Sequence, residues 1–316
     1  MKRALLFAGQ GSQYVGMTKD LVEQWPVARA LAQEANDLLG FDLLSMMHDG
    51  PSDTLTETRY TQPALFLHEA MVLAITEAHH GASMLAGHSL GEFSAYYAAG
   101  ALSFADALHL VALRGKLMFE AGETVPGTMA AVVGLDDHQV EQVCAEYHRG
   151  TDDATVVPAN YNAPGQVVIS GSRDYVRELL PAFKAAGAKL VKELNVSGAF
   201  HSPLLQSASE RFSEALAAVF FANATIPVYT NVHGTPTVEA ESLRQAAAQQ
   251  LTAPVRWTLS LRNIQADGGS MFVEIGPGTV LQGLVKRTLP SLSTESCFGL
   301  DTQVQCQQWI EREPSV

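Results

Sequence analysis

The sequence predicts an α/β protein that has a large domain built on a parallel sheet and a small subdomain inserted into it. Apolar runs at 3–8 and 83–86 each end at glycine and are followed by helical sequence, as strands of a parallel sheet are. Between 125 and 196 the pattern runs strand, helix, strand, strand, helix, strand, which is the ferredoxin-like order. We therefore expect 1–124 and 197–316 to form the large domain and 125–196 the small ferredoxin-like subdomain.

The strands are predicted from short apolar runs, as in buried strands, and the helices from apolar residues at three- to four-residue spacing. For the large domain the pattern predicts strands at 3–8, 83–86, 227–229 and 271–275 and helices at 18–39, 62–78, 91–99, 103–121, 203–218, 241–250 and 258–267. For the small subdomain it predicts strands at 129–133, 155–159, 166–170 and 190–196 and helices at 136–147 and 175–186. The tail after Pro290 has weak periodicity, and no element is predicted there.

The composition excludes several classes of protein. A formal charge of -13 over 316 residues disfavours attraction to nucleic acid. The apolar run near the N-terminus is too short for a signal sequence, and no run is long enough for a membrane span, so we expect a cytoplasmic enzyme. The three cysteines lack metal-ligand spacing and are expected to be reduced thiols, with neither a disulfide nor a metal site.

The sequence Gly87-His88-Ser89-Leu90-Gly91 lies between a predicted strand and a predicted helix, which is the context of a nucleophile elbow. Glycines at both ends allow the strand and the helix to approach closely, and Ser89 lies at the apex of the turn. Such a turn exposes the serine and points backbone N–H groups at a developing oxyanion. The large domain is therefore expected to be α/β-hydrolase-like, with Ser89 as its nucleophile.

Two histidines compete for the role of base. The side chain of His88 should diverge from that of the adjacent Ser89, so we interpret His88 as a packing or loop residue. His201 lies on the predicted connection from the small subdomain back to the large domain, where it can reach a cleft wall. His201 is the better candidate, although its position alone does not distinguish it from a structural histidine.

Arg114 lies in the middle of the apolar stripe of the helix 103–121, whereas Lys116 falls on the opposite face. A buried arginine needs a partner, which is either an internal carboxylate or the carboxylate of a ligand. The backbone N–H of Gln10 could face the same cleft as the elbow, and the carbonyl of Gln250, at a helix end, could accept a hydrogen bond from an imidazole. Ordinary loop and helix-end glutamines remain the alternative.

Several segments together closely resemble the malonyl-CoA:acyl carrier protein transacylase family. They are FAGQGSQ at 7–13, GHSLGEFSA at 87–95, ALRG at 112–115, NYNAPGQ at 160–166, GAFHSP at 198–203, Gln250 with PVRW at 254–257, and EIGPG at 274–278. The order is that of the family, and the resemblance extends from residue 4 to about residue 288.

The resemblance implies a ping-pong reaction in which Ser89 attacks the malonyl thioester and His201 serves as base and then as acid. It also implies that the backbone N–H groups of Gln10 and Leu90 form the oxyanion hole. The main-chain carbonyl of Gln250 would orient His201, where a triad hydrolase uses a carboxylate. No cofactor and no metal are implied, because the coenzyme A thioester is itself the substrate.

The resemblance further matches Arg114 to the position that pairs with the malonyl carboxylate. Phe200 and Met118 are the expected specificity positions, with Phe200 favouring malonyl over branched acyl groups. The implied partners are malonyl-CoA and an acyl carrier protein, either discrete or within a polyketide synthase. For this acidic carrier, the locally basic stretch 173–192 is a candidate docking surface, and a solvated helix face is the alternative.

Ala8 replaces the proline usual in the family, and Thr252-Ala253 departs from its frequent residues, but neither change removes a side chain with an implied catalytic role. Both fatty-acid synthesis and polyketide synthesis with a free-standing acyltransferase fit the sequence. A proofreading acyl-thioester hydrolase with the same serine and histidine is the main rival, and Arg114 argues against it. A scaffolding module without chemistry is the second rival.

Overall fold

The computed structural model describes residues 2–312, which form two sheets. The larger sheet has the strand order β10-β9-β1-β2-β7-β8, and its neighbouring strands are parallel except for the antiparallel pair β7 and β8. Its strands are β1 (Lys2–Phe7), β2 (Met84–Gly87), β7 (Val228–Tyr229), β8 (Pro236–Thr237), β9 (Gly269–Ile275) and β10 (Cys297–Leu300). The register pairs Phe7 with both Gly87 and Ile275, so three strands end together at the carboxyl edge of the sheet.

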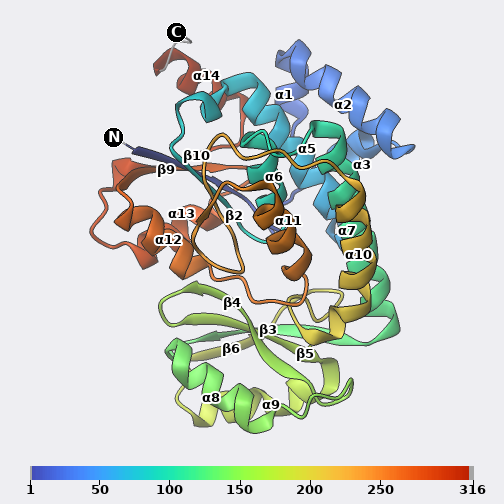
Figure 1. The fold of residues 1–316 in the computed structure, drawn as a ribbon, viewed down its shortest axis with the longest axis vertical. Helices are drawn as coiled ribbons and strands as arrows, with labels where there is room; N and C mark the ends of the chain where they lie inside the picture. The colour runs from blue at the N-terminus through green and yellow to red at the C-terminus, as the bar shows by residue number, and fades with distance from the viewer. Residues whose placement is uncertain (1, 313–316) are drawn as a thin grey trace.

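Both faces of this sheet are buried, as expected for parallel strands. In β1, Leu5 and Phe7 belong to one apolar cluster, while Ala4 and Leu6 belong to another on the opposite face. Figure 1 shows the helices of the first cluster on one side of the sheet and those of the second on the other. The first side holds α5 (Thr58–Thr76), α6 (Gly91–Ala98), α7 (Phe104–Thr124), α10 (Gln206–Ala218) and α11 (Ala240–Gln249), and the second holds α12 (Trp257–Ala266) and α13 (Val280–Thr288). None of the helices within residues 2–312 is long and apolar enough to cross a membrane.

The smaller sheet has the order β4-β5-β3-β6 with every pair antiparallel, which confirms the predicted ferredoxin-like arrangement. Its elements are β3 (Gly127–Val133), α8 (Asp137–Tyr147), β4 (Val156–Ala163), β5 (Gln166–Ser172), α9 (Arg173–Ala185) and β6 (Leu190–Glu193). Helices α8 and α9 cover its outer face, while Met129 and Val168 on its inner face join the core of the large sheet (Figure 1). The domain boundaries at 124/125 and 196/197 stay a prediction.

The predicted helix 18–39 is wrong as one element. It divides into α1 (Lys19–Gln24) and α2 (Pro26–Leu39), because Trp25, which precedes a proline, is extended and Pro26 starts a new helix. The sequence pattern also missed several elements of the large domain, which are α3 (Leu43–Asp49), α4 (Ser52–Thr56), the short 3₁₀ turns η1 (Ala78–Gly81) and η3 (Thr294–Ser296), β8, α13, and α14 (Gln303–Arg312) with β10 in the tail. The 3₁₀ turn η2 (Pro203–Leu205) forms the start of the predicted helix 203–218. The other predicted elements of the large domain are present, with ends that differ by a few residues.

Candidate active site

Ser89 lies on the turn between β2 and α6 with a φ of 53°, a left-handed conformation that residues with a Cβ atom rarely adopt. The two flanking glycines are required by close backbone contacts. A Cβ atom on Gly87 would lie 1.9 Å from the carbonyl carbon of Gly91, and one on Gly91 would lie 2.3 Å from the carbonyl oxygen of Phe7. The strand and the helix thus approach closely, with Ser89 at the apex, which is the geometry of a nucleophile elbow.

His201 is hydrogen-bonded to Ser89, with 2.8 Å between Nε2 and the serine Oγ. Its Nδ1 lies 2.8 Å from the main-chain oxygen of Gln250. Because a carbonyl oxygen can only accept, Nδ1 carries the ring proton and Nε2 is left to accept the proton of Ser89 Oγ. Burial, together with the positive charge of Arg114, lowers the pKa of His201 to about 3. The imidazole is therefore neutral near pH 7 and has the protonation state of a base.

Arg114, on α7, is fully buried with its guanidinium against the serine. Its Nη1 donates to Gln62 Oε1 at 2.8 Å, and its Nη2 donates to Gln250 Oε1 at 2.9 Å and to Ser89 Oγ at 3.1 Å. All three acceptors are neutral. Burial lowers the pKa of Arg114 to about 10, and the carboxylate of Glu92 opposes this shift, so the guanidinium is charged at neutral pH.

The internal ion pair that the sequence left open for Arg114 is not formed. Among residues 2–312, no carboxylate lies within ion-pair distance of its guanidinium. A buried charge whose hydrogen-bond partners are all neutral is costly to the folded state. The arrangement is therefore suited to receive an anion from outside the protein, next to the serine hydroxyl.

The backbone N–H groups of Gln10 and Leu90 lie at the carboxyl edge of the large sheet. Leu90 follows the serine, and the pairing of Phe7 with Gly87 places the loop of Gln10 beside the elbow. Neither N–H donates a hydrogen bond to any other residue that the structure describes. The side chain of Gln10 is held at 3.1 Å by Thr58 Oγ1 on α5. Both N–H groups are therefore available to a ligand.

The two predicted specificity residues are both buried, Met118 near Arg114 and Phe200 next to His201. Met118 lies one turn after Arg114 on α7, and its Sδ accepts a hydrogen bond from Gln62 Nε2 at 3.2 Å. Gln62 also binds the guanidinium, so a single side chain connects Met118 to Arg114. Phe200 immediately precedes His201 and is 5% exposed.

His88 does not take part in this constellation. Its Nε2 lies 2.8 Å from Asn162 Oδ1, and its ring packs edge-on against Trp257 at 5.4 Å between centroids. The predicted packing role of His88 is confirmed.

Comparison with known proteins identifies the family. The model of the acyl transferase domain matches residues 4–305. The malonyl CoA-acyl carrier protein transacylase of Bacillus subtilis is 42% identical over 314 residues, which cover 99% of this chain and 98% of that protein. That of Escherichia coli K12 is 40% identical over 295 residues, with 93% and 94% covered. The chain belongs to the malonyl-CoA:acyl carrier protein transacylase family.

Solved structures of the family superpose over nearly the whole chain. An acyl carrier protein S-malonyltransferase from Vibrio cholerae has a TM-score of 0.91 at 38% identity, covering 98% of this chain and 99% of that one. A malonyl-transacylase solved in complex with the acyl carrier protein of a type II polyketide synthase has a TM-score of 0.92 at 38% identity, covering 99% of this chain and 100% of that one. The predicted fold class is therefore confirmed.

Sequence reasoning missed the amide side chains that support the site. Gln62 lies on α5, whose other inward residues are mostly apolar. A glutamine among apolar residues was the one sequence feature that could have indicated a buried polar contact there. Asn231 follows β7 and contacts the elbow, and no sequence motif marks it. The side chain of Gln250 was missed as well, because the sequence pointed only to its carbonyl.

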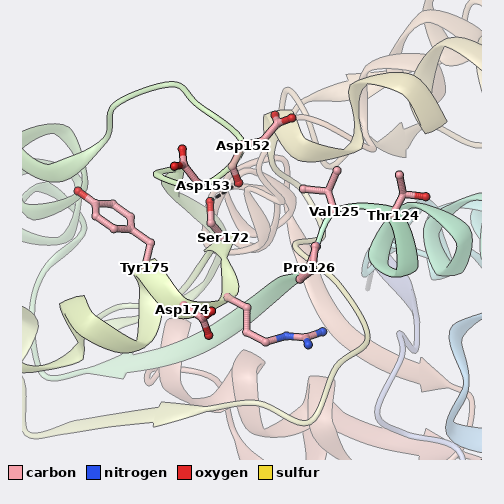
Figure 2. Close-up of a pocket in the computed structure, with 9 residues that line it drawn as sticks. Thr124, Val125, Pro126, Asp152, Asp153, Ser172, Asp174 and Tyr175 are labelled. Atoms are coloured by element: carbon pink, nitrogen blue, oxygen red, sulfur yellow. Dashed lines mark hydrogen bonds between the residues drawn. The ribbon is translucent and has the colours of Figure 1, made fainter.

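The basic stretch 173–192 is less basic in space than in sequence. A pocket of about 390 Å³ lies where this stretch begins, and its lining has three carboxylates, of Asp152, Asp153 and Asp174, beside Arg173 (Figure 2). Further along α9, Arg177 pairs with Glu193 at 3.0 Å. Arg177 is therefore ion-paired, and the role of the stretch 173–192 in docking an acidic partner stays a prediction.

Proposed function

We propose that this chain transfers malonyl from malonyl-CoA to the phosphopantetheine thiol of an acyl carrier protein through a malonyl ester of Ser89. The main support is the buried, charged guanidinium of Arg114, which contacts the serine Oγ and has no carboxylate within ion-pair distance among the described residues. In a malonyl ester, the free carboxylate lies one methylene beyond the ester carbonyl. A carboxylate at that distance suits a guanidinium 3.1 Å from Oγ.

In the first half-reaction, Ser89 Oγ attacks the thioester carbonyl and its proton passes to His201 Nε2. The oxyanion of the tetrahedral intermediate accepts hydrogen bonds from the N–H groups of Leu90 and Gln10. The carbon–sulfur bond then breaks, and His201 returns the proton to the departing coenzyme A thiolate. The carbonyl of Gln250 stabilises the imidazolium that forms between these two steps.

The second half-reaction reverses the roles. The carrier thiol gives its proton to His201 as its sulfur attacks the malonyl ester, and the proton then returns to Ser89 Oγ as the ester bond breaks. Arg114 holds the malonyl carboxylate throughout, while Phe200 and Met118 limit the space for branched acyl groups.

The names of the relatives support malonyl-CoA and an acyl carrier protein as the two substrates. The superposed transacylase with its polyketide carrier and the curated relatives together support both a fatty-acid and a polyketide context. Three buried free thiols fit a reducing compartment, and we assign the enzyme to the cytoplasm.

The intact mass of the protein, measured after brief exposure to malonyl-CoA and again after addition of an acyl carrier protein, tests the proposal. We expect a malonyl adduct that moves to the carrier, and no adduct on Ser89→Ala. A wild-type protein without an adduct, or an undiminished adduct on Ser89→Ala, would contradict the mechanism. Rapid loss of the adduct as free malonate without a carrier would instead identify a hydrolase.

A further inference from the structure

Asn231 holds both sides of the elbow with one side chain. Its Oδ1 accepts the N–H of Ser89 at 2.8 Å, and its Nδ2 donates to the carbonyl of Gly87 at 2.7 Å. The same Oδ1 accepts from Gln250 Nε2 at 3.3 Å. Asn231 is fully buried, so these contacts replace hydrogen bonds that water cannot make there.

The contacts of Asn231 have a consequence for the oxyanion hole. Two consecutive N–H groups, of Ser89 and Leu90, follow the strand, and a tight turn could present either of them to the reacting carbonyl. Asn231 takes the N–H of Ser89, and that of Leu90 is left without an acceptor among the described residues. The side chain thereby selects which N–H group faces the substrate.

Asn231 is in turn fixed by a buried carboxylate. Its backbone N–H donates to Glu92 Oε2 at 2.5 Å, and the other oxygen of Glu92 accepts from the hydroxyl of Tyr96. Both Glu92 and Tyr96 belong to α6, the helix that starts at the elbow. The turn, the helix and the segment after β7 are therefore locked together by polar contacts that are not part of any regular element.

We infer that Asn231 is a positioning residue for acyl transfer, which orients the elbow so that the N–H of Leu90 is directed at the oxyanion. The inference rests on the proposed function only for the identity of the acyl group. The orientation itself applies to any reaction in which Ser89 attacks an electrophile and an anionic oxygen develops beside it.

The test compares three variants in two reactions. Asn231→Ala removes all three side-chain contacts. Asn231→Asp keeps the shape and the acceptor for the Ser89 N–H, but when ionised it presents an oxygen to the carbonyl of Gly87. Thr230→Val is the matched control, because Thr230 is adjacent and fully buried, and its hydroxyl has no partner within the described part of the chain. The reactions are single-turnover malonylation by malonyl-CoA and labelling by a fluorophosphonate, in which Ser89 Oγ bonds to phosphorus and fluoride leaves.

Loss of an oriented oxyanion donor should slow both reactions on the order of 10²-fold in Asn231→Ala, in the maximal rate and not in the half-saturating concentration of malonyl-CoA. Thr230→Val should stay within about twofold, because no polar contact is lost. Folded Asn231→Ala with wild-type maximal rates, or with a change only in half-saturation, would overturn the inference. A wild type that reacts with the fluorophosphonate but not with malonyl-CoA would refute the proposed function, and the labelling rates would still test Asn231.

Asn231→Asp keeps the inference testable if Asn231→Ala does not fold. When protonated, the carboxyl introduced by Asn231→Asp can donate to the carbonyl of Gly87. The labelling rate of this variant should therefore rise as the pH falls from about 8 to about 6, since burial raises a carboxyl pKa. The titratable groups around position 231, which are Glu92, Tyr96, Arg114 and His201, are also present in Thr230→Val, so a rise confined to Asn231→Asp reports position 231. A fully active, pH-independent Asn231→Asp would contradict the role.

Discussion

The two halves of the active site are built from different kinds of groups. Beside Ser89 and His201 lie several main-chain groups, namely the carbonyl of Gln250, which binds His201, and the free N–H groups of Leu90 and Gln10, while the side chain of Asn231 holds the N–H of Ser89. Around Arg114 the partners are side-chain atoms, the amide oxygens of Gln62 and Gln250 and the serine hydroxyl.

This difference separates general chemistry from substrate choice. Main-chain groups act on any acyl carbonyl and are kept under substitution as long as the fold is kept. Under the proposed function, side-chain groups bind the distal carboxylate, and they can change without loss of the nucleophile. Gln250 belongs to both halves, since its carbonyl binds His201 and its amide binds Arg114. The following substitutions test whether the two halves act separately.

The largest effect is expected for His201→Gln. Loss of the general base should lower transfer on the order of 10³-fold for malonyl and for acetyl alike, because the proton transfer does not involve the distal carboxylate. Steady-state rates with malonyl-CoA and acetyl-CoA measure this. A loss restricted to malonyl would break the proposed separation.

The lowered pKa of the buried His201 imidazole predicts how the rate and the stability depend on pH, and His201→Gln is the comparison for stability. Since the pKa of His201 is about 3, the wild-type rate should not fall with its protonation between about pH 7 and about pH 5. The unfolded chain, with an ordinary histidine, binds a proton in this range while the folded chain does not. Stability attributable to His201 therefore decreases as the pH falls from about 6.5 toward 3, by a few kcal/mol. Denaturant unfolding of His201→Gln should show a flatter pH dependence than the wild type.

Arg114→Ala should lower malonyl transfer on the order of 10²-fold and acetyl transfer by less than about threefold, because only malonyl places a carboxylate on the guanidinium. Lys116→Ala is the control, since Lys116 lies on the same helix with its side chain 63% exposed and pairs with Glu120. Equal losses with both acyl groups would show that Arg114 serves the nucleophile and not the substrate.

A smaller effect is expected for Gln62→Glu, which gives Arg114 an internal carboxylate at the position of the present 2.8 Å contact. The new ion pair should compete with malonyl and raise its half-saturating concentration about tenfold, with little change for acetyl. Gln62→Met, which supplies no charge, separates competition from simple loss of the hydrogen bond. Unchanged malonyl kinetics in Gln62→Glu would mean that the guanidinium does not meet the substrate carboxylate.

The smallest effect is expected for Phe200→Ala, which should raise the use of methylmalonyl-CoA relative to malonyl-CoA by about fivefold, because one methyl group is worth only about 1–3 kcal/mol in an apolar pocket. Phe220→Ala, at a phenylalanine that is 78% exposed, is the control. Competition between the two thioesters, followed by mass spectrometry of the carrier, gives the ratio. An unchanged ratio would remove Phe200 from the specificity residues.

The sequence was sufficient to predict those features that depend on neighbouring residues alone. The elbow follows from glycine spacing between a strand and a helix, and the burial of Arg114 follows from helical periodicity on α7. The small subdomain follows from its order of elements. The short helices α3 and α4 have too few turns for a periodic pattern. The apolar pattern continues from α1 into α2, so it does not show the break that the extended Trp25 and Pro26 make between them.

The supporting amides could not be predicted in the same way. Asn231 is 142 residues from Ser89 in the sequence, and only the pairing of β2 with β7 brings them together. Gln62 reaches Arg114 across a contact between two helices. Burial of an uncharged glutamine or asparagine indicates a hydrogen-bond partner, but the identity of that partner becomes visible only when the distances are known.

Ser89 and His201 both have left-handed backbones, with φ values of 53° and 56°. Each such conformation costs a residue with a Cβ atom on the order of 1 kcal/mol, a cost that glycine avoids. Glycine at position 89 or 201 would therefore make the folded state more stable, but it would remove the nucleophile or the base. Substitutions that stabilise this protein and keep the reaction must therefore lie elsewhere in the chain, because a glycine at either position would remove a side chain on which the proposed reaction depends.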